Sequence, residues 1–128
     1  MTRFAAGVLS SLLTCLGVSA ACAQSFPTKP VTILVGIAPG NSNDIPLRMM
    51  LPHLQKTLGQ PVVIDYKPGA GGNIAYTTVA KNVAPDGYTL VASTSGVVTV
   101  PLFNKVACDA ITDLPPVAIY ARFRALMA

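Results

Sequence analysis

The sequence predicts an α/β fold built on a parallel sheet. Short apolar, β-branched runs alternate along the chain with segments whose apolar residues recur at helical spacing. The runs are apolar on both faces, which is typical of strands that helices cover on both sides. Loops rich in glycine, proline, serine and asparagine separate the two kinds of segment.

The chain begins with the pattern of a secretory signal peptide, which we predict over residues 1–23. Arg3 precedes an almost uncharged apolar stretch, and the small residues of an Ala-Cys-Ala motif fit a signal peptidase site. The stretch is short for a transmembrane helix, which needs about 20 apolar residues. We therefore expect cleavage after Ala23 and export of residues 24–128 to the periplasm. An uncleaved anchor and a lipoprotein acylated at Cys22 are the lesser alternatives.

Cysteine content and charge narrow the range of partners. The expected cleavage leaves Cys108 as the one remaining cysteine, so no intramolecular disulfide is predicted. Loss of Arg3 leaves eight of the nine Lys and Arg residues against five Asp residues, a net charge of +3. The basic residues are scattered, so we expect no nucleic acid partner. A mild positive charge suits anionic solutes, although ordinary solubility also accounts for it.

The first strand is predicted at residues 31–37 and is followed by a turn-rich loop at residues 38–44. A helix should then begin at about Ile45 and end before Gly59. Its apolar face is formed by Leu47, Leu51, Leu54 and Leu58. Pro52 lies inside this helix, where a proline costs about 3 kcal/mol. We therefore expect either a kink at Pro52 or a helix that starts late.

The order of strand, loop and helix then repeats. The expected elements are a strand at residues 62–66, a loop at 67–73, a helix at about 74–83, a turn at 84–87, a strand at 88–92, a polar loop at 93–96, a short apolar segment to Phe103 and a last strand at 117–121. In a parallel sheet the loops after the first three strands lie at one edge, where open α/β sheets bind ligands.

These three loops are rich in Gly, Ser, Thr and Asn, and Lys67 is their one basic residue. If they bind an anion, backbone amides at helix N-termini must supply much of the binding. The same residue types also cap helices and form turns without any ligand. The residue chemistry alone leaves both interpretations open.

The sequence contains no convincing pattern for catalysis or for metal binding. The glycine-rich run at residues 69–74 resembles the start of a dinucleotide fingerprint, but Ile74 stands at the third glycine position and no suitable acid follows. His53 is the one histidine and lies on the predicted helix, where a surface or packing role is favoured. Cys108 has no histidine neighbour in sequence. We therefore expect that the protein is not an enzyme and that it has neither a cofactor nor a metal site.

Five motifs in register resemble the receptors of tripartite tricarboxylate transporters, known as the Bug family. The motifs are PVTILV at residues 30–35, APG to DI at 38–45, LGQPVV at 58–63, PGAGGNI at 68–74 and APDGYTL at 84–90. The resemblance implies a periplasmic receptor that captures a small carboxylate and delivers it to a membrane permease. It also implies two α/β domains of the type II periplasmic-binding-protein architecture, with the ligand between them.

The resemblance further indicates which residues contact the solute. The first binding loop is matched by Asn41, Ser42, Asn43 and Asp44, and a later one by Thr94, Ser95 and Gly96. Gly71, Gly72 and Asn73 belong to a loop that characterises the family and are further candidates. The family's first loop usually has glycine and a small residue where Asn41 and Asn43 stand, so we expect backbone approach or ligand choice to differ here.

Members of this family are more than twice as long as this chain. The resemblance therefore implies that residues 24–128 are an incomplete N-terminal portion of domain I and that the second domain is missing. The alternative function is a non-binding remnant or a small exported interaction module. A fragment of an oxidoreductase or transferase would rest on the glycine-rich loop alone. The residues do not predict which carboxylate is bound.

Overall fold

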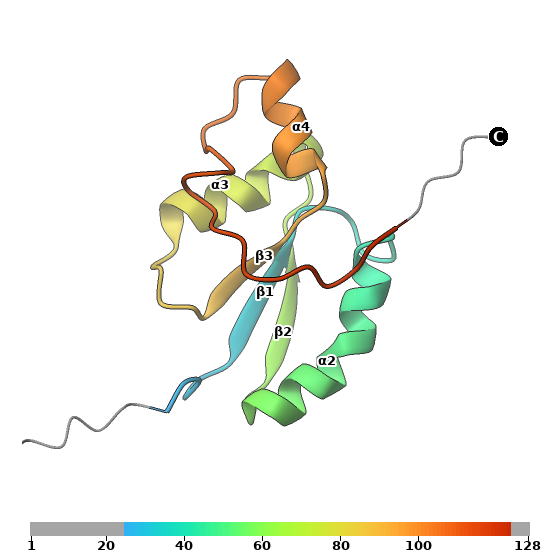
Figure 1. Cartoon of the computed structure of the whole chain (residues 1–128), viewed down its shortest axis with the longest axis vertical. Helices are drawn as coiled ribbons and strands as arrows, with labels where there is room; N and C mark the ends of the chain where they lie inside the picture. The colour runs from blue at the N-terminus through green and yellow to red at the C-terminus, as the bar shows by residue number, and fades with distance from the viewer. Residues whose placement is uncertain (1–24, 124–128) are drawn as a thin grey trace, which may run out of the picture.

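A three-stranded parallel sheet in the order β2-β1-β3 forms the centre of the computed structural model, which describes residues 25–123. The strands are β1 (Val31–Val35), β2 (Val62–Tyr66) and β3 (Thr89–Ala92), and β1 lies in the middle (Figure 1). The α/β class, the parallel sheet and the bounds of the second strand are confirmed. β1 is shorter than predicted, because the chain bends at Gly36.

One face of the sheet is covered by α2 (Asp44–Leu58). Leu47 packs with Ile33, Val35, Val62 and Ala92 in a buried cluster. The other three leucines of the predicted apolar face, Leu51, Leu54 and Leu58, border this cluster. Full burial of a leucine side chain is worth about 1.5 to 3 kcal/mol. Leu47 is buried and the other three leucines are partly buried, so each of the three contributes less than Leu47.

The helix α2 is continuous through Pro52. The predicted late start is wrong, because α2 begins at Asp44, where the side chain of Asn41 holds the first turn. Proline at this position removes the hydrogen bond to the Arg48 carbonyl group. Pro52 and Arg48 are both exposed, so water can reach that carbonyl oxygen. Gly59 ends the helix in the left-handed conformation, with φ at 66°.

The opposite face is covered by α3 (Asn73–Asn82), which follows the short 3-10 helix η2 (Ala70–Gly72). Ala75 and Tyr76 are the buried residues of α3. Figure 1 shows α2 and α3 on either side of the sheet, and α4 (Gly96–Phe103) follows β3. The predicted helix at residues 74–83 and the apolar segment to Phe103 therefore correspond to helices.

Residues 117–121 do not form the predicted strand. They have no strand partner within the described part of the chain, and Val117 and Ile119 are 79% and 73% exposed. The segment instead crosses the molecule without regular structure, and Tyr120 packs against the core cluster (Figure 1). An apolar run becomes a strand only where a neighbouring strand accepts and donates its backbone hydrogen bonds, and the run itself does not show whether such a neighbour exists.

Other predictions concern single residues and the start of the chain. His53 is exposed on α2, as its predicted surface role requires, and Cys108 is a buried free cysteine. None of the helices within residues 25–123 is long and apolar enough to cross a membrane. The predicted signal peptide at residues 1–23 lies outside the described residues.

Candidate functional site

Three loops gather at the carboxyl-terminal edge of the sheet. They are residues 36–43 after β1, residues 67–72 including η2 after β2, and residues 93–95 after β3. Parallel strands direct these loops to the same edge, and Figure 1 shows α4 beside the start of α3 there. Each loop, together with the first residue of the helix that follows it, carries residues predicted to bind the solute.

The first loop is closed by the side chain of Asn41. Its Oδ1 accepts hydrogen bonds from the backbone N–H groups of Asn43 at 2.7 Å and of Asp44 at 3.2 Å. The N–H of Asp44 also donates to the Asn41 carbonyl oxygen at 3.1 Å. The N–H groups of Asn43, which precedes α2, and of Asp44, its first residue, are therefore satisfied within the protein, although the side chain of the N-cap residue Asn43 makes no capping bond. Ser42 is exposed, and Asn43 is 2% exposed.

Asp44 is a buried carboxylate that faces protein donors. It is 1% exposed, and its Oδ2 accepts the N–H of Gly40 at 2.8 Å. The Nε of Arg48 lies 3.0 and 2.9 Å from its two oxygens, and the hydroxyl of Tyr66 donates to Oδ1. The bonds from Tyr66, Gly40 and Arg48 hold the pKa of Asp44 below its usual value. Burial, followed by the bond to Asp44, raises the pKa of Tyr66. Asp44 is thus ionised at neutral pH and directed into the protein.

The second loop packs closely against the end of β1. A Cβ atom added to Gly36 would lie 2.6 Å from the Cα of Gly72, closer than real side chains approach. Gly72 also lies against the ring of Tyr76, which is 1% exposed. Burial raises the pKa of Tyr76, and hydrogen bonding with Thr94 partly offsets this effect. Tyr76 therefore connects the second loop to the third.

The third loop is a short turn that leads into α4. The Oγ1 of Thr94 accepts the N–H of Gly96 at 3.2 Å, and its carbonyl oxygen accepts the N–H of Val97 at 3.1 Å. Ser95 is exposed between these two bonds. A Cβ atom added to Gly96 would lie 3.7 Å from the carbonyl oxygen of Gly71. The second and third loops are therefore in contact.

The structure brings some predicted site residues together and places others apart. Gly71 and Gly72 lie beside residues 94–96, whereas residues 41–44 are tied to the end of β2 through Tyr66. Asn73 is the first residue of α3 and lines a separate cavity. The site is therefore a pair of touching loops with a third loop at the same edge of the sheet.

The sequence did not predict a role for three residues that order these loops, namely Arg48, Tyr66 and Tyr76. The spacing of four residues between Asp44 and Arg48 is the one available signal, since such pairs meet on a helix. Nothing in the sequence pairs Tyr66 with Asp44, because they are separated by a whole helix and a strand. Tyr76 resembles an ordinary core residue until Gly72 and Thr94 are seen beside it.

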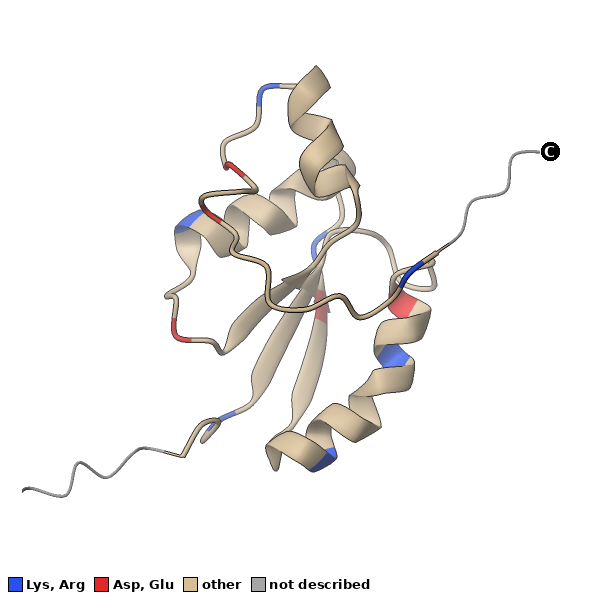
Figure 2. Cartoon of the chain, in the orientation of Figure 1, with Lys and Arg blue, Asp and Glu red and all other residues tan. Residues whose placement is uncertain are grey.

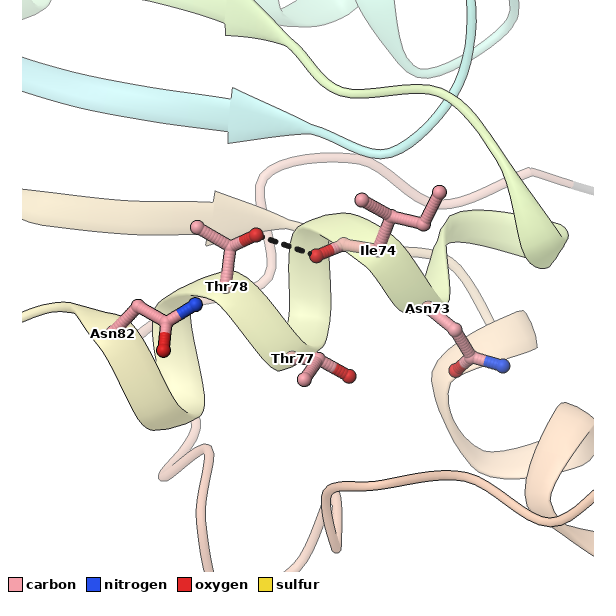
Figure 3. A pocket seen from close by; sticks show the side chains of 5 residues that line it. All are labelled: Asn73, Ile74, Thr77, Thr78 and Asn82. Atoms are coloured by element: carbon pink, nitrogen blue, oxygen red, sulfur yellow. Dashed lines mark hydrogen bonds between the residues drawn. The ribbon is translucent and has the colours of Figure 1, made fainter.

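A shallow cavity of about 320 Å³ lies on α3, and Figure 3 shows its lining side chains. The lining residues are Asn73, Ile74, Thr77, Thr78 and Asn82. The Oγ1 of Thr78 donates to the Ile74 carbonyl oxygen at 2.7 Å, so that hydroxyl is engaged within the helix. All five lining residues are uncharged, and Figure 2 shows charged residues scattered over the described chain. The chemistry of this cavity therefore does not make it a better site for an anionic solute than the three loops.

Comparison with known proteins identifies the family. The sequence model of the family described as tripartite tricarboxylate transporter family receptor matches residues 47–127. The chain belongs to this receptor family. It is 43% identical over 113 residues to a UPF0065 protein of Bordetella bronchiseptica, covering 87% of this chain and 33% of that protein. It is 37% identical over 123 residues to protein BugT of Bordetella pertussis, covering 93% and 37%. The chain thus spans about a third of the length of these curated relatives.

Solved structures of similar proteins agree with the fold of this receptor-family chain. MatC from Rhodopseudomonas palustris with bound malate is 39% identical, with a TM-score of 0.64 over 74% of this chain and 33% of that protein. A second R. palustris protein, solved with adipate, is 40% identical, with a TM-score of 0.54 over 56% and 24%. The predicted family and the predicted periplasmic-binding-protein architecture are confirmed. Receptors of this family are periplasmic, in keeping with the export expected from the sequence.

Proposed function

We propose that this chain is the N-terminal portion of domain I of a periplasmic receptor that binds a small carboxylate. The observation that carries the proposal is the gathering of three polar loops at the carboxyl-terminal edge of the sheet, in a member of the tripartite tricarboxylate receptor family. Open α/β sheets bind ligands at this edge. Similar proteins were solved with malate and with adipate, which are both dicarboxylates.

The proposed solute contacts divide into direct ligands and residues that shape the loops. The exposed hydroxyl groups of Ser42 and Ser95 are the proposed direct ligands. Asn43 is 2% exposed and is proposed to help shape the first loop. Asn41 and Asp44 order the first loop, since their polar atoms bond to the protein. The second and third loops are shaped by Gly71, Gly72, Asn73, Thr94 and Gly96.

The charge of the solute would be met mainly by hydrogen bonds rather than by a cationic side chain. Lys67 is the one basic residue in the three loops. A hydrogen bond to a charged group is worth about 1.5 to 3 kcal/mol, and a helix N-terminus adds about 0.3 to 1 kcal/mol. Two such bonds approach the roughly 4.1 kcal/mol of a millimolar dissociation constant. We therefore expect residues 24–128 alone to bind carboxylates in the millimolar range.

In the same proposal, the whole receptor delivers its solute to a membrane permease and catalyses no reaction. Membership of the receptor family supports both parts of this statement. The residues described in the three loops provide hydrogen-bonding groups but no paired nucleophile and base of the kind that acyl transfer requires.

A second candidate function is a small exported interaction module. It is favoured by Leu102, Phe103 and Ile111, which are 75%, 84% and 81% exposed. Leu102 and Ile111 line one apolar groove between α4 and the segment that follows it. Apolar surface of this kind marks sites of protein association.

The two candidates are separated by titrating malate and adipate into the ¹⁵N-labelled exported chain and following its amide resonances. The receptor proposal predicts shifts at residues 41–44, 71–73 and 94–96 that saturate in the millimolar range. Acetamide, a neutral molecule of similar chemistry, is the control and should cause no saturating shift. Absence of saturable shifts with every carboxylate would contradict carboxylate binding by this chain and favour the interaction module.

A further inference from the structure

We infer that Arg48 and Tyr66 are positioning residues that hold the first binding loop in its binding shape through Asp44. The inference rests on the proposed function, because it concerns the loop that is proposed to contact the solute. It assigns a role to two side chains that lie outside every predicted binding motif. These three residues come from the start of α2, the next turn of α2 and the end of β2.

The Asp44 carboxylate is the point at which these elements meet. Its Oδ1 accepts from the Tyr66 hydroxyl and from Arg48 Nε at 3.0 Å, and its Oδ2 accepts from Arg48 Nε at 2.9 Å and from the Gly40 N–H at 2.8 Å. Both oxygens are therefore occupied by protein donors, and the residue is 1% exposed. A solute carboxylate would gain nothing from this buried negative charge, so the role of Asp44 in binding is indirect.

The hydrogen bonds of Asp44 link the end of the first loop back to its middle, at Gly40 and Asn41. Its side chain holds the Gly40 N–H, while its own N–H donates to the carbonyl oxygen of Asn41 at 3.1 Å. Ser42, one of the proposed direct ligands, lies in sequence between Asn41 and Asp44 and is therefore held by these bonds. A loop that is held in one shape before binding loses less conformational freedom when the solute arrives.

Arg48 and Tyr66 in turn hold the Asp44 carboxylate in place. An Nη atom of Arg48 donates to the Tyr66 hydroxyl oxygen at 2.6 Å, and that hydroxyl group donates to Asp44. The guanidinium carbon of Arg48 lies 5.8 Å from the centre of the Tyr66 ring. The ring of Tyr66 packs against the core cluster, so the hydroxyl group is anchored to the sheet. Without these donors the carboxylate would be free to rotate toward water and release Gly40.

The test compares the wild-type exported chain with Tyr66→Phe, which removes one hydroxyl group and keeps the ring in the core. Tyr88→Phe is the matched control. The Tyr88 hydroxyl oxygen accepts the Thr28 N–H at 2.9 Å near the amino-terminal ends of the strands, away from the three loops. If the binding shape falls to about a tenth of the population, the apparent dissociation constant for malate rises about tenfold. We expect this rise, together with faster hydrogen exchange of the Gly40 amide, for Tyr66→Phe but not for Tyr88→Phe.

Arg48→Lys is the second variant and guards against a folding defect in the first. It keeps the positive charge at an exposed position but cannot bond to both Asp44 and Tyr66 through a planar group. It should also weaken malate binding and speed exchange at Gly40. Equal affinity and unchanged Gly40 exchange in both variants would overturn the inference, even if both melted at a lower temperature. Failure of the wild-type chain to bind would instead contradict the proposed function, and the Gly40 exchange would still decide whether this bonding orders the loop.

Discussion

At the residue scale, the first loop shows how polar side chains that suggest a ligand can be engaged by the protein itself. Asn41 bonds to two amides at the start of α2, and Asp44 bonds to Gly40, Arg48 and Tyr66. Ser42 remains exposed between them. The loop therefore combines residues that determine its shape with residues that are accessible to a solute.

The ionisation of Asp44 should make the stability of the protein depend on pH in acid. Its pKa in the folded protein is held below the ordinary value of 3.8, so the folded state binds a proton more weakly than the unfolded state. Its contribution is therefore complete above the unfolded pKa and is lost as the pH falls through the lower folded pKa. We expect wild-type protein to melt at a higher temperature than Asp44→Asn at neutral pH, with the difference shrinking in acid. Asp65→Asn, at an exposed position, is the control. A difference that stays constant with pH would contradict the role of the ionised carboxylate.

Asn41 should contribute to stability through the start of α2. Its side chain accepts two backbone N–H groups, which Asn41→Ala would leave without that partner. A hydrogen bond within a protein has a net value of about 0.5 to 1.5 kcal/mol, and we expect a loss of about that size in urea unfolding. Asn104→Ala, at an exposed position where the backbone bonds to Val100, should cost less. Equal losses for the two variants would show that the Asn41 side chain has no special role.

At the element scale, the spacing of loops depends on close contact between backbones. The end of β1 meets η2 at Gly36 and Gly72, and η2 meets the start of α4 at Gly71 and Gly96. These contacts lie at the edge of the sheet where the solute is proposed to bind. Small residues there do more than form turns, since they allow the loops to approach one another.

Gly36→Ala should therefore disturb both the fold and the site. The added Cβ atom would lie 2.6 Å from backbone atoms of Gly72, which cannot rotate away as a side chain can. Overpacking of this kind typically costs about 1 to 3 kcal/mol, and we expect amide shifts at residues 71–73 in addition to the lower stability. The control is Gly96→Ala, where the nearest atom is a side-chain oxygen of Thr94 at 3.2 Å. If the two variants lose equal stability, the close contact at Gly36 is not the cause.

At the scale of the whole molecule, the sheet is covered on both faces near β1 but apolar side chains remain exposed elsewhere. Val63 on β2 is 50% exposed, and Leu102 and Phe103 at the end of α4 are 75% and 84% exposed. Within the described residues, β2 and β3 each have one edge without a strand partner. Exposed edges and apolar surface both favour association with other chains.

Residues 24–128 should therefore self-associate as their concentration rises. Phe103→Asp should reduce the association measured by sedimentation velocity, because it places a charge on the most exposed apolar side chain of α4. Met49→Asp is the control, since Met49 is similarly exposed at 73% but lies on α2. A wild-type chain that stays monomeric at every concentration would show that this apolar surface does not mediate self-association.

The sequence by itself determined the α/β class, the parallel direction of the strands and the places of the main elements. Apolar runs and capping residues act locally, so the strand at residues 62–66 and the leucine face of α2 could be predicted from spacing alone. Five motifs in register also identified the receptor family, which the comparison confirmed. The three candidate loops could be placed at one edge of the sheet for the same reason, since parallel strands end together.

Only the tertiary structure decided what depends on distant partners. Residues 117–121 have an apolar pattern suited to a strand but no neighbouring strand among the described residues, so they are not one. Pro52 is tolerated within α2 because it lies at an exposed position. The bond between Tyr66 and Asp44 joins residues that are 22 positions apart, and the contact between Gly36 and Gly72 joins two different loops. Local sequence governs propensity, whereas pairing, burial and close approach are set by segments that meet only when the chain folds.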